Sequence, residues 1–576
     1  MKTFNELKKN LKKDFSKLKT VKLAVLGDSA TQLLVQAIKC YGYETGHNFD
    51  IYEADYAQIE RQIFDSSSEL YRFNPEFIIV FHSSQKLLKN FYKLDNSEKA
   101  VFAEKHINYI SNLYHAVASQ LKSKIILFNY SEINDSIFGN YANKTNLSFI
   151  YQLRRINLEL MNLAQQLNNF FIVDLCLQQS HYGTEFMIDH KVFMSTDIIF
   201  SIDFLPVIAK NAVDAITATL GNIKKCVILD LDNTAWGGLI GDDGIENIQI
   251  GDLGAGKAFT ELQLWLKQLK QRGIILAVCS KNDEDAAKEP FHKHPDMVLT
   301  IDDIAVFVAN WEDKPANIRY IQSVLNIGFD SMVFLDDSPF ERNMVRAHIP
   351  DITVPELPED PAEYLSYLRT LNLFETASFT GEDGQRTRQY QQEAQRAVVQ
   401  MRCASEDDFL AGLNMYSDVS PVDKFNSPRV AQLTQRSNQF NLRTIRYTDE
   451  DMQHIRGSDQ FLTFAFTLED TFGDYGLISA VFLKKRAQGL FVDTWLMSCR
   501  VLKRGMESFV LNTIVESARR NGYEEIVGEY IPTLKNGMVK DHYKNLGFKK
   551  VEGKDNEWCL AVGEYKNLKT HISVKA

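Results

Sequence analysis

The sequence predicts an α/β protein with several domains, and three observations support this fold class. The chain has 576 residues, 45% of them hydrophobic, which at the usual domain size is enough for about three cores. Through the first two-thirds of the chain, short apolar runs of strand type alternate with helical patterns, as in parallel sheets covered by helices. From about residue 400 the pattern changes to long consecutive strands, which favours an antiparallel meander in an α+β domain.

These changes of pattern predict how the chain is divided. We expect an α/β domain at 1–222, a second α/β domain at 223–372, a helical linker at 373–400 and an α+β domain at 401–576. No internal repeat or low-complexity tract interrupts this order.

The first domain is predicted from four apolar runs that read as buried strands, at 21–26, 77–81, 124–128 and 170–174. The first of them leads into Gly27-Asp28-Ser29. This turn resembles the nucleophile block of SGNH hydrolases, in which the serine attacks an ester.

The rest of that resemblance is incomplete. His82-Ser83-Ser84-Gln85 follows the second run where the family has G-x-N-D, and no D-x-x-H pair lies near the end of the domain. A serine without a base is not an activated nucleophile. We therefore expect a degenerate SGNH-like or flavodoxin-like domain that serves packing or carrier docking, with esterase activity at Ser29 as the alternative.

The second domain contains the motif with the most chemistry. A strand-type run at 227–229 ends in Asp230 and Asp232, and Thr234 follows. One carboxylate of such a pair can attack phosphorus while the other handles the proton. Carboxylates this close repel each other and need a cation, so Mg²⁺ is implied. An aspartate-rich turn after a buried strand is common, however, and the motif alone also fits an ordinary turn.

Three later features favour phosphoryl transfer. A second buried-strand pattern ends in Ser280, Lys314 precedes a helical pattern, and a third strand pattern ends in Asp336 and Asp337. The carboxyl ends of parallel strands meet at one edge of a sheet, where open α/β folds bind ligands. We therefore expect these side chains to gather around Asp230.

Together these residues resemble the four motifs of the haloacid dehalogenase (HAD) superfamily, over about 224–372. The resemblance implies that Asp230 is the nucleophile, which forms an aspartyl-phosphate, and that Asp232 is the general acid and base. It implies that Asp336 holds Mg²⁺ with the Asp230 carboxylate and the Asp232 backbone carbonyl, and that Asp337 supports the site. It also implies that Thr234, Ser280 and Asn282 bind and orient phosphate oxygens. Lys314 would supply positive charge.

Four segments narrow the resemblance to the FkbH-like branch of that superfamily: DLDNTAWGGLIGDDG at 230–244, then CSKND, NWEDKP and FLDDSPFER. The segments at 429–442 and 495–502 fit the same branch. Its members load a glyceryl unit from a glycolytic bisphosphate onto an acyl carrier protein. The resemblance therefore implies an Mg²⁺-dependent enzyme that dephosphorylates 1,3-bisphosphoglycerate and transfers the glyceryl unit to a carrier thiol.

Two other functions remain open. The chain can be a plain phosphatase for a small sugar phosphate or another phosphomonoester, with flanking domains that act as a scaffold. It can also be a binding protein with a vestigial site, although the intact set of motif residues argues against this. The stretch between Thr234 and the next strand reads as a flap and one helix at 258–272, so we expect no large cap and an open site.

The C-terminal pattern resembles the GNAT acyltransferases. In that family a tyrosine at the position of Tyr543 can protonate a leaving thiolate, and an R/Q-x-x-G-x-G/A turn holds the acyl-CoA pyrophosphate on its amides. Here the turn runs from Arg500 to Gly505, with Lys503 where the first glycine belongs. We hypothesise that the domain receives a carrier's phosphopantetheine arm in place of CoA, with a structural remnant as the alternative. The expected elements are strands at 461–466, 475–483, 490–498 and 526–530 and a helix at 506–521.

A loading enzyme also needs a group that holds the acyl unit, and two cysteines lie near the motifs. Cys279 precedes Ser280 at the strand edge, and Cys499 precedes Arg500. Thiolates are good acyl acceptors and good leaving groups. Alternation along the strand can instead point Cys279 into the core.

Composition narrows the class of protein further. The net charge of -11 argues against nucleic acid as a main partner. The seven cysteines are scattered without C-x-x-C spacing, so we expect neither a zinc site nor a disulfide framework. No apolar run approaches membrane-spanning length and no signal peptide is recognisable, so we expect a cytoplasmic protein.

Overall fold

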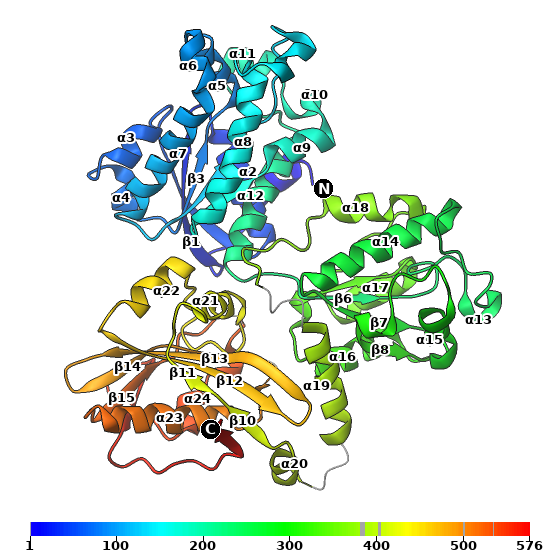
Figure 1. The fold of residues 1–576 in the computed structure, drawn as a ribbon, viewed down its shortest axis with the longest axis vertical. Helices are drawn as coiled ribbons and strands as arrows, with labels where there is room; N and C mark the ends of the chain where they lie inside the picture. Colours follow the sequence, from blue (N-terminus) through cyan, green and yellow to red (C-terminus); the bar gives the residue numbers. More distant parts are fainter. Residues whose placement is uncertain (1, 381–385, 401–404, 499–500, 534, 576) are drawn as a thin grey trace. The chain divides into compact units, whose positions relative to one another are not determined.

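The computed structural model describes the chain apart from residues 1, 381–385, 401–404, 499–500, 534 and 576, and apart from the side chains of 393–395, 397–400 and 449. The chain forms two compact units, Met1–Thr217 and Ala218–Ala576. Each unit is built around its own hydrophobic cores, and Figure 1 shows the helices and strands of the chain. None of the helices in the described part of the chain has the length and apolarity needed to cross a membrane.

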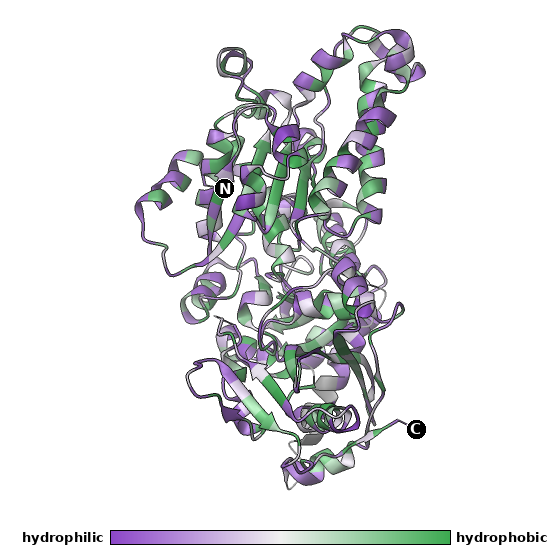
Figure 2. Cartoon of the chain, turned by 90° about the vertical axis from the view of Figure 1, so that its left-hand side faces the viewer, coloured by the Kyte–Doolittle hydropathy of each residue, from purple (hydrophilic) through white to green (hydrophobic). Residues whose placement is uncertain are grey.

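The first unit contains a parallel sheet of five strands in the order β2-β1-β3-β4-β5, a flavodoxin-like order. The four predicted strands are present, and Figure 2 shows the interior of this sheet as strongly hydrophobic between helices of mixed colour. The strands are β1 (Lys19–Gly27), β2 (His47–Glu53), β3 (Phe77–Phe81), β4 (Lys124–Phe128) and β5 (Phe170–Val173). The helices before β4 are α1 (Phe4–Lys8), α2 (Gln32–Glu44), α3 (Ile59–Phe64), α4 (Glu69–Phe73), α5 (Ser84–Phe91), α6 (Asn96–Ala100) and α7 (Phe102–Ala118). Those after β4 are α8 (Phe149–Gln166), α9 (Leu175–Tyr182), α10 (Thr184–Met187), α11 (His190–Thr196) and α12 (Leu205–Thr219).

Strand β2 is not among the strands predicted from the sequence. This edge strand pairs only with β1 and has half-exposed and exposed positions along its length. Its sequence, HNFDIYE, therefore lacks the continuous apolar run by which the inner strands were recognised.

The second unit begins with a four-stranded parallel sheet in the order β8-β7-β6-β9. Helix α14 covers one face with Phe259 and Leu262, and helix α16 covers the other with Ile318 and Ile321. The strands are β6 (Cys226–Leu229), β7 (Ile275–Ser280), β8 (Ile304–Ala309) and β9 (Met332–Leu335). The helices are α13 (Ile240–Asp243), α14 (Gly254–Gln271), α15 (Glu284–Lys293), α16 (Lys314–Leu325), α17 (Pro339–His348) and α18 (Tyr364–Thr370). Between Thr234 and β7 the chain forms only α13, α14 and their loops, so the expectation of no large cap is confirmed.

Helix α19 (Arg386–Gln400) forms where the sequence predicts a helical linker, and it is docked on the neighbouring sheet. Tyr390 is buried in the core on the α16 face, and Gln391 Nε2 donates to the carbonyl oxygens of Asp302 and Ile304 (3.2 and 2.9 Å). Further along the helix, Arg396 forms an ion pair with Asp470, the last residue of β12 (Phe461–Asp470), at 2.7 Å. The helix is therefore a packed element between the two sheets of this unit.

The C-terminal part is an α+β fold around a large mixed sheet, and all the strands and the helix predicted for it are present. Its main path runs β16-β17-β15-β14-β13-β12-β10-β18, and only the pairs β14–β15 and β10–β18 are parallel. The first strands are β10 (Met415–Ser417), β11 (Val419–Ser420), β12 (Phe461–Asp470), β13 (Gly473–Lys485) and β14 (Gly489–Met497). The others are β15 (Glu525–Glu529), β16 (Lys549–Lys550), β17 (Glu557–Ala561) and β18 (Ile572–Val574). The helices are α20 (Glu406–Gly412), α21 (Ser427–Arg436), α22 (Asp449–Arg456), α23 (Met506–Arg520) and α24 (His542–Asn545).

Candidate active site

The carboxyl edge of the β8-β7-β6-β9 sheet brings the predicted motif residues together. Asp230 follows β6, Ser280 ends β7 and Asp336 follows β9, while Lys314 begins α16 after β8. Parallel pairing keeps these strand ends level, since Leu229 lies opposite both Val278 and Leu335. The chain therefore places four motif side chains at one sheet edge, as the spacing predicts.

Lys314 is the cation at the centre of this edge. Its Nζ lies 2.8 Å from Asp230 Oδ2 and also contacts Asp336 Oδ2. The Lys314 side chain is only 3% exposed, and burial alone would lower its pKa. The two carboxylates outweigh that effect and leave the pKa of Lys314 above its usual value. The lysine is therefore charged and compensates part of the negative charge.

Three carboxylates face one another at the site. Asp230, Asp336 and Asp337 each offer an oxygen atom, and these atoms all lie within 4.8 Å of one another. Burial, together with the charge of Asp230, raises the pKa of both Asp336 and Asp337. One lysine does not balance three carboxylates, and a set of hard oxygen donors suits Mg²⁺. The residues present therefore fit a divalent cation.

The side chain of Asp232 has its own set of hydrogen bonds and is not one of the three clustered carboxylates. Its Oδ1 accepts hydrogen bonds from Trp236 Nε1 (3.0 Å) and from the amide of Ile240 (3.1 Å), and its Oδ2 accepts from Asn282 Nδ2 (3.0 Å). These bonds hold the carboxylate over the turn that follows β6. A metal contact from Asp232 would thus come from its backbone, as the resemblance implies, while Asp337 supplies a carboxylate that the sequence analysis gave only a supporting role.

The predicted phosphate-binding residues lie on both sides of Asp230. Thr234 is fully buried, its Oγ1 accepts a hydrogen bond from the Asp337 amide (3.0 Å), and Ser280 Oγ accepts one from Asn282 Nδ2 (3.1 Å). The Asn282 amide therefore links the hydroxyl of Ser280 to the carboxylate of Asp232. All three are held by short-range contacts that fix their orientation.

Two residues that the sequence analysis gave no role support the site. Trp236 donates to Asp232 from a fully buried position, and Arg342 Nη1 donates to the carbonyl oxygens of Asp336 and Asp337 (2.8 and 2.6 Å). Arg342 thereby fixes the turn that carries both carboxylates. The tryptophan lies in the motif segment 230–244, but its polar contact depends on the fold of the flap and leaves no periodic pattern.

Cys279 does not have the environment of an acyl acceptor. The residue is fully buried in the core on the α16 face, and burial raises the pKa of its thiol to about 12. Acyl transfer needs an accessible thiolate. The structure therefore gives no support to Cys279 as the acyl-carrying residue, because its side chain lies in the core on the α16 face.

The surroundings of Tyr543 give its expected role no support. Its ring is buried in the core of the C-terminal domain, against Trp495 and Phe548, and a Cβ atom at Gly528 would clash with it. Burial raises the pKa of the hydroxyl well above its usual value. The tyrosine therefore remains a predicted proton donor whose hydroxyl is enclosed in the core.

The predicted pyrophosphate turn is only partly described. Cys499 and Arg500 lie outside the described residues. Lys503 and Gly505 both have a left-handed backbone (φ 62° and 75°), and α23 begins directly after Gly505. The chain itself fills the space beside the end of β14: Met497 N donates to Phe440 O (3.1 Å), and Leu442 N donates to Trp495 O (3.2 Å).

Ser29 shows no sign of activation. Its hydroxyl is buried, and no histidine among the described residues is hydrogen-bonded to it. The neighbouring Asp28 accepts hydrogen bonds from the Ser83 amide and hydroxyl (2.9 and 3.3 Å). The geometry therefore gives the esterase alternative no support.

Comparisons with known proteins agree with the geometry. A family model described as the FkbH N-terminal domain matches residues 22–217. A solved structure from Bacteroides fragilis, the N-terminal part of a protein that contains a phosphatase domain, complexed with Mg, is 55% identical. It covers 66% of this chain and 100% of its own, with a TM-score of 0.64. The comparison with curated proteins gives no match.

Solved acetyltransferases also resemble a part of the chain. The ribosomal-protein-S18-alanine N-acetyltransferase of Escherichia coli is 12% identical and covers 27% of this chain and 99% of its own, with a TM-score of 0.20. A similarity this low supports no conclusion. The identity and coverage of the phosphatase-domain structure do: the chain belongs to the FkbH-like branch of the HAD superfamily and contains a HAD-type phosphatase domain.

Proposed function

We propose that this enzyme dephosphorylates 1,3-bisphosphoglycerate and transfers the glyceryl unit to the thiol of an acyl carrier protein, with Mg²⁺ as cofactor. The observation that carries the phosphatase part is the cluster of Asp230, Asp336 and Asp337 around Lys314. The transfer part is supported by the FkbH N-terminal domain match and by the absence of a large cap between Thr234 and β7 in the described chain.

The phosphoryl-transfer step follows from the residues at the sheet edge. Asp230 Oδ attacks phosphorus, the ester O–P bond breaks, and Asp232 gives a proton to the leaving oxygen. Water then attacks the aspartyl-phosphate, Asp232 takes its proton, and inorganic phosphate leaves. Lys314 lies within contact of Asp230 and offsets charge throughout, while Thr234 and Ser280 orient phosphate oxygens.

The divalent cation would be held by Asp230, Asp336 and Asp337 and the backbone of Asp232. When bound, it neutralises phosphate oxygens and the crowded carboxylates. The raised pKa values of Asp336 and Asp337 have burial as their main cause and the nearby charge of Asp230 as the next. A bound cation would relieve both effects.

The acyl step breaks a different bond. The carrier thiolate attacks the carbonyl carbon of the mixed anhydride, the C–O bond breaks, and phosphate leaves as the thioester forms. Because Cys279 is buried, we assign the attack to the carrier's own thiol. The remaining phosphomonoester is then the substrate for Asp230.

The test is intact-protein mass spectrometry after incubation with Mg²⁺, 1,3-bisphosphoglycerate and a phosphopantetheinylated carrier. A glyceryl-sized gain on the carrier that requires the enzyme supports the proposal. An unmodified carrier, together with phosphate release from simple esters that Asp230→Asn abolishes, would replace it with the plain phosphatase that acts on a small phosphomonoester.

A further inference from the structure

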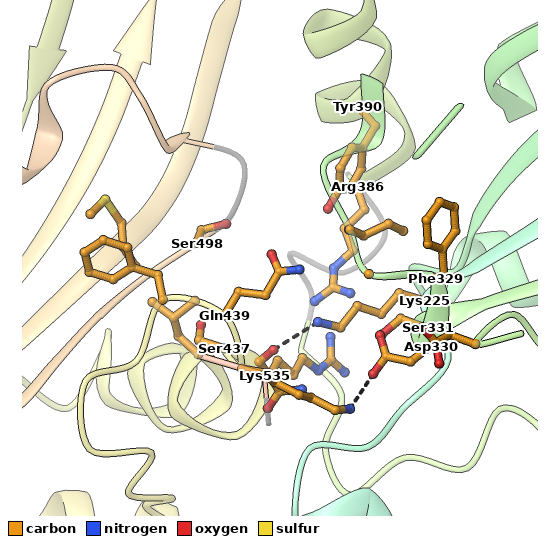
Figure 3. A pocket seen from close by; sticks show the side chains of 18 of the residues that line it. Lys225, Phe329, Asp330, Ser331, Arg386, Tyr390, Ser437, Gln439, Ser498 and Lys535 are labelled. Atoms are coloured by element: carbon orange, nitrogen blue, oxygen red, sulfur yellow. Dashed lines mark hydrogen bonds and ion pairs between the residues drawn. The ribbon is translucent and has the colours of Figure 1, made fainter. Parts of the chain in front are cut away.

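A cavity lies in the unit formed by residues 218–576, and the motif residues around Asp230 are not part of its lining. It has a volume of about 420 Å³. Lys225 and Ser331, which immediately precede β6 and β9, lie in its wall, whereas Asp230 and Asp336 follow the same strands. The cavity is therefore at the opposite edge of the phosphatase sheet. Its remaining walls come from α19, α21 and the end of β14 (Figure 3).

The described lining of this cavity is strongly cationic. Five of its side chains are lysine or arginine: Lys225, Arg386, Arg429, Arg436 and Lys535. Only two, Asp330 and Asp351, are acidic. Five positive and two negative groups leave an excess of three positive charges in a chain whose net charge is -11. Such a local reversal of sign favours an anionic ligand.

The contacts inside the cavity show how closely the cations are packed. Asp330 forms an ion pair with Lys535, and its backbone oxygen accepts a hydrogen bond from Lys224 Nζ (2.7 Å). Lys225 Nζ donates to the backbone oxygen of Arg436 (3.0 Å), as drawn in Figure 3. Burial and the nearby charge of Lys535 lower the pKa of Lys224 to about 8, against the opposing effect of Asp330. Two lysines of this region thus donate to backbone oxygens, and the carboxylate of Asp330 pairs with Lys535.

The lining is not uniformly polar. Phe329, Leu433, Phe440 and Met497 contribute apolar surface, and Ser437, Asn438 and Gln439 contribute hydroxyl and amide groups beside it. A small inorganic ion would use only the cations. A ligand with a phosphate at one end and an uncharged chain bearing a few hydrogen-bonding groups would use both kinds of surface.

We propose that this cavity binds a phosphate ester carried on an uncharged organic chain, and that the bound ligand links the phosphatase domain to the C-terminal domain. The walls come from both, so the ligand would stabilise their packing. The chain can belong to a free small molecule or to the phosphopantetheine arm of a carrier protein. The second source rests on the proposed function, whereas the cavity's chemistry does not.

The experiment measures binding by calorimetry with the full chain, at low salt and with EDTA in place of Mg²⁺. The probes are 4′-phosphopantetheine, pantetheine without the phosphate, and inorganic phosphate. We expect 4′-phosphopantetheine to bind at least about tenfold more tightly than either of the others and to raise the melting temperature. Equal binding of pantetheine, equal binding of inorganic phosphate, or no binding at millimolar concentration would overturn the proposal.

Substitutions of lining residues test whether the ligand binds in this cavity. Lys535→Gln and Arg386→Gln should each weaken 4′-phosphopantetheine binding about tenfold, and Lys544→Gln, an exposed lysine of the same domain, should not. Gln439→Trp narrows the cavity without changing its charge and should also weaken binding. This variant keeps the test valid if a charge variant folds poorly. Unchanged affinity in all three cavity variants would contradict the assignment.

Two further experiments distinguish failure of this proposal from failure of the proposed function. Asp230→Asn should abolish phosphatase activity and leave 4′-phosphopantetheine binding unchanged. A phosphopantetheinylated carrier that competes with the free ligand, while the unmodified carrier does not, identifies the carrier's arm as the source. Binding of the free ligand without such competition keeps the cavity assignment and identifies a small molecule as the source.

Discussion

The two parallel sheets of this chain each present an aspartate and a hydroxyl residue at the carboxyl end of an inner strand. After β1 these are Asp28 and Ser29, and after β6 they are Asp230 and Thr234. Around Asp230 a lysine and two further carboxylates converge from neighbouring strand ends. Around Ser29 the described residues supply no hydrogen-bonded base. Reactivity therefore depends on convergence from several strands, which a single strand-end motif does not provide.

The two aspartates also differ in what compensates their burial. Asp230 lies 2.8 Å from the buried ammonium of Lys314. Asp28 receives hydrogen bonds from Ser83, and Lys86 donates to its backbone oxygen, yet burial raises the pKa of Asp28 to about 6. The first arrangement stabilises charge for chemistry, and the second leaves a carboxyl group that is protonated in mild acid.

Substitution of Asp230 and substitution of Ser29 should differ most in their effect on kcat. Asp230→Asn should lower the kcat for phosphomonoester hydrolysis by about 10⁴-fold or more, since it removes the attacking atom. Ser29→Ala should leave kcat unchanged. A steady-state phosphate-release assay checks both, and a strong loss in Ser29→Ala would invalidate the contrast between the sheets.

The next largest difference is expected between substitution of Lys314, beside Asp230, and substitution of Lys86, beside Asp28. Lys314→Gln should lower kcat by about 10² to 10³-fold and destabilise the fold by about 3–5 kcal/mol, because it leaves buried carboxylates uncompensated. Lys86→Gln, beside Asp28, should leave kcat unchanged. Phosphate release and urea unfolding measure the two effects. A stable and active Lys314→Gln enzyme would show that the ammonium is dispensable.

Asp28 should make the stability of the first unit depend on pH. Its folded-state pKa of about 6 lies above the usual aspartate value of 3.8, so the folded protein binds more protons between these values and stability falls as pH rises through that window. The loss is about 2–3 kcal/mol, which Asp28→Asn should remove. Urea unfolding from pH 3.5 to 7 compares the two proteins, and identical slopes would refute the assignment.

Substitution of Trp236 tests whether its hydrogen bond to Asp232 supports proton transfer. Trp236→Phe removes one donor to Asp232 Oδ1 and leaves the Ile240 amide and Asn282 in place. We expect about a tenfold lower kcat and a displaced pH–rate profile, with KM little changed. A change in KM alone would mean that the tryptophan acts on substrate binding.

The smallest effect is expected at Cys279. Cys279→Ala should keep phosphatase activity and glyceryl transfer within about twofold and cost about 1 kcal/mol, as for a small cavity in a core. Loss of transfer with phosphatase activity intact would restore the thiol as an acyl carrier.

The phosphatase sheet and its site could largely be predicted because strand ends in a parallel sheet lie at one edge. That rule alone placed Asp230, Ser280, Lys314 and Asp336 together. It could not separate Cys279 from Ser280, since a strand buried on both faces shows no polar alternation. Strand β2 was missed for the opposite reason, as a partly exposed edge strand.

Side-chain direction was the least predictable property. Tyr543 fits a family position by sequence, but its ring packs into the core next to Gly528. Asp337 and Asp232 are both aspartates of the expected motifs, yet only Asp337 turns its carboxylate toward Asp230. Such choices are made by tertiary packing, which local sequence patterns do not encode.

The most direct test of the central claim is to locate the phosphoryl group on the enzyme. The protein is mixed with Mg²⁺ and a phosphomonoester, quenched in acid within milliseconds and digested for peptide mass spectrometry. A phosphate on Asp230, absent when EDTA replaces Mg²⁺, is the predicted result. A phosphate on another residue, or on none while the substrate is turned over, would contradict nucleophilic catalysis by Asp230.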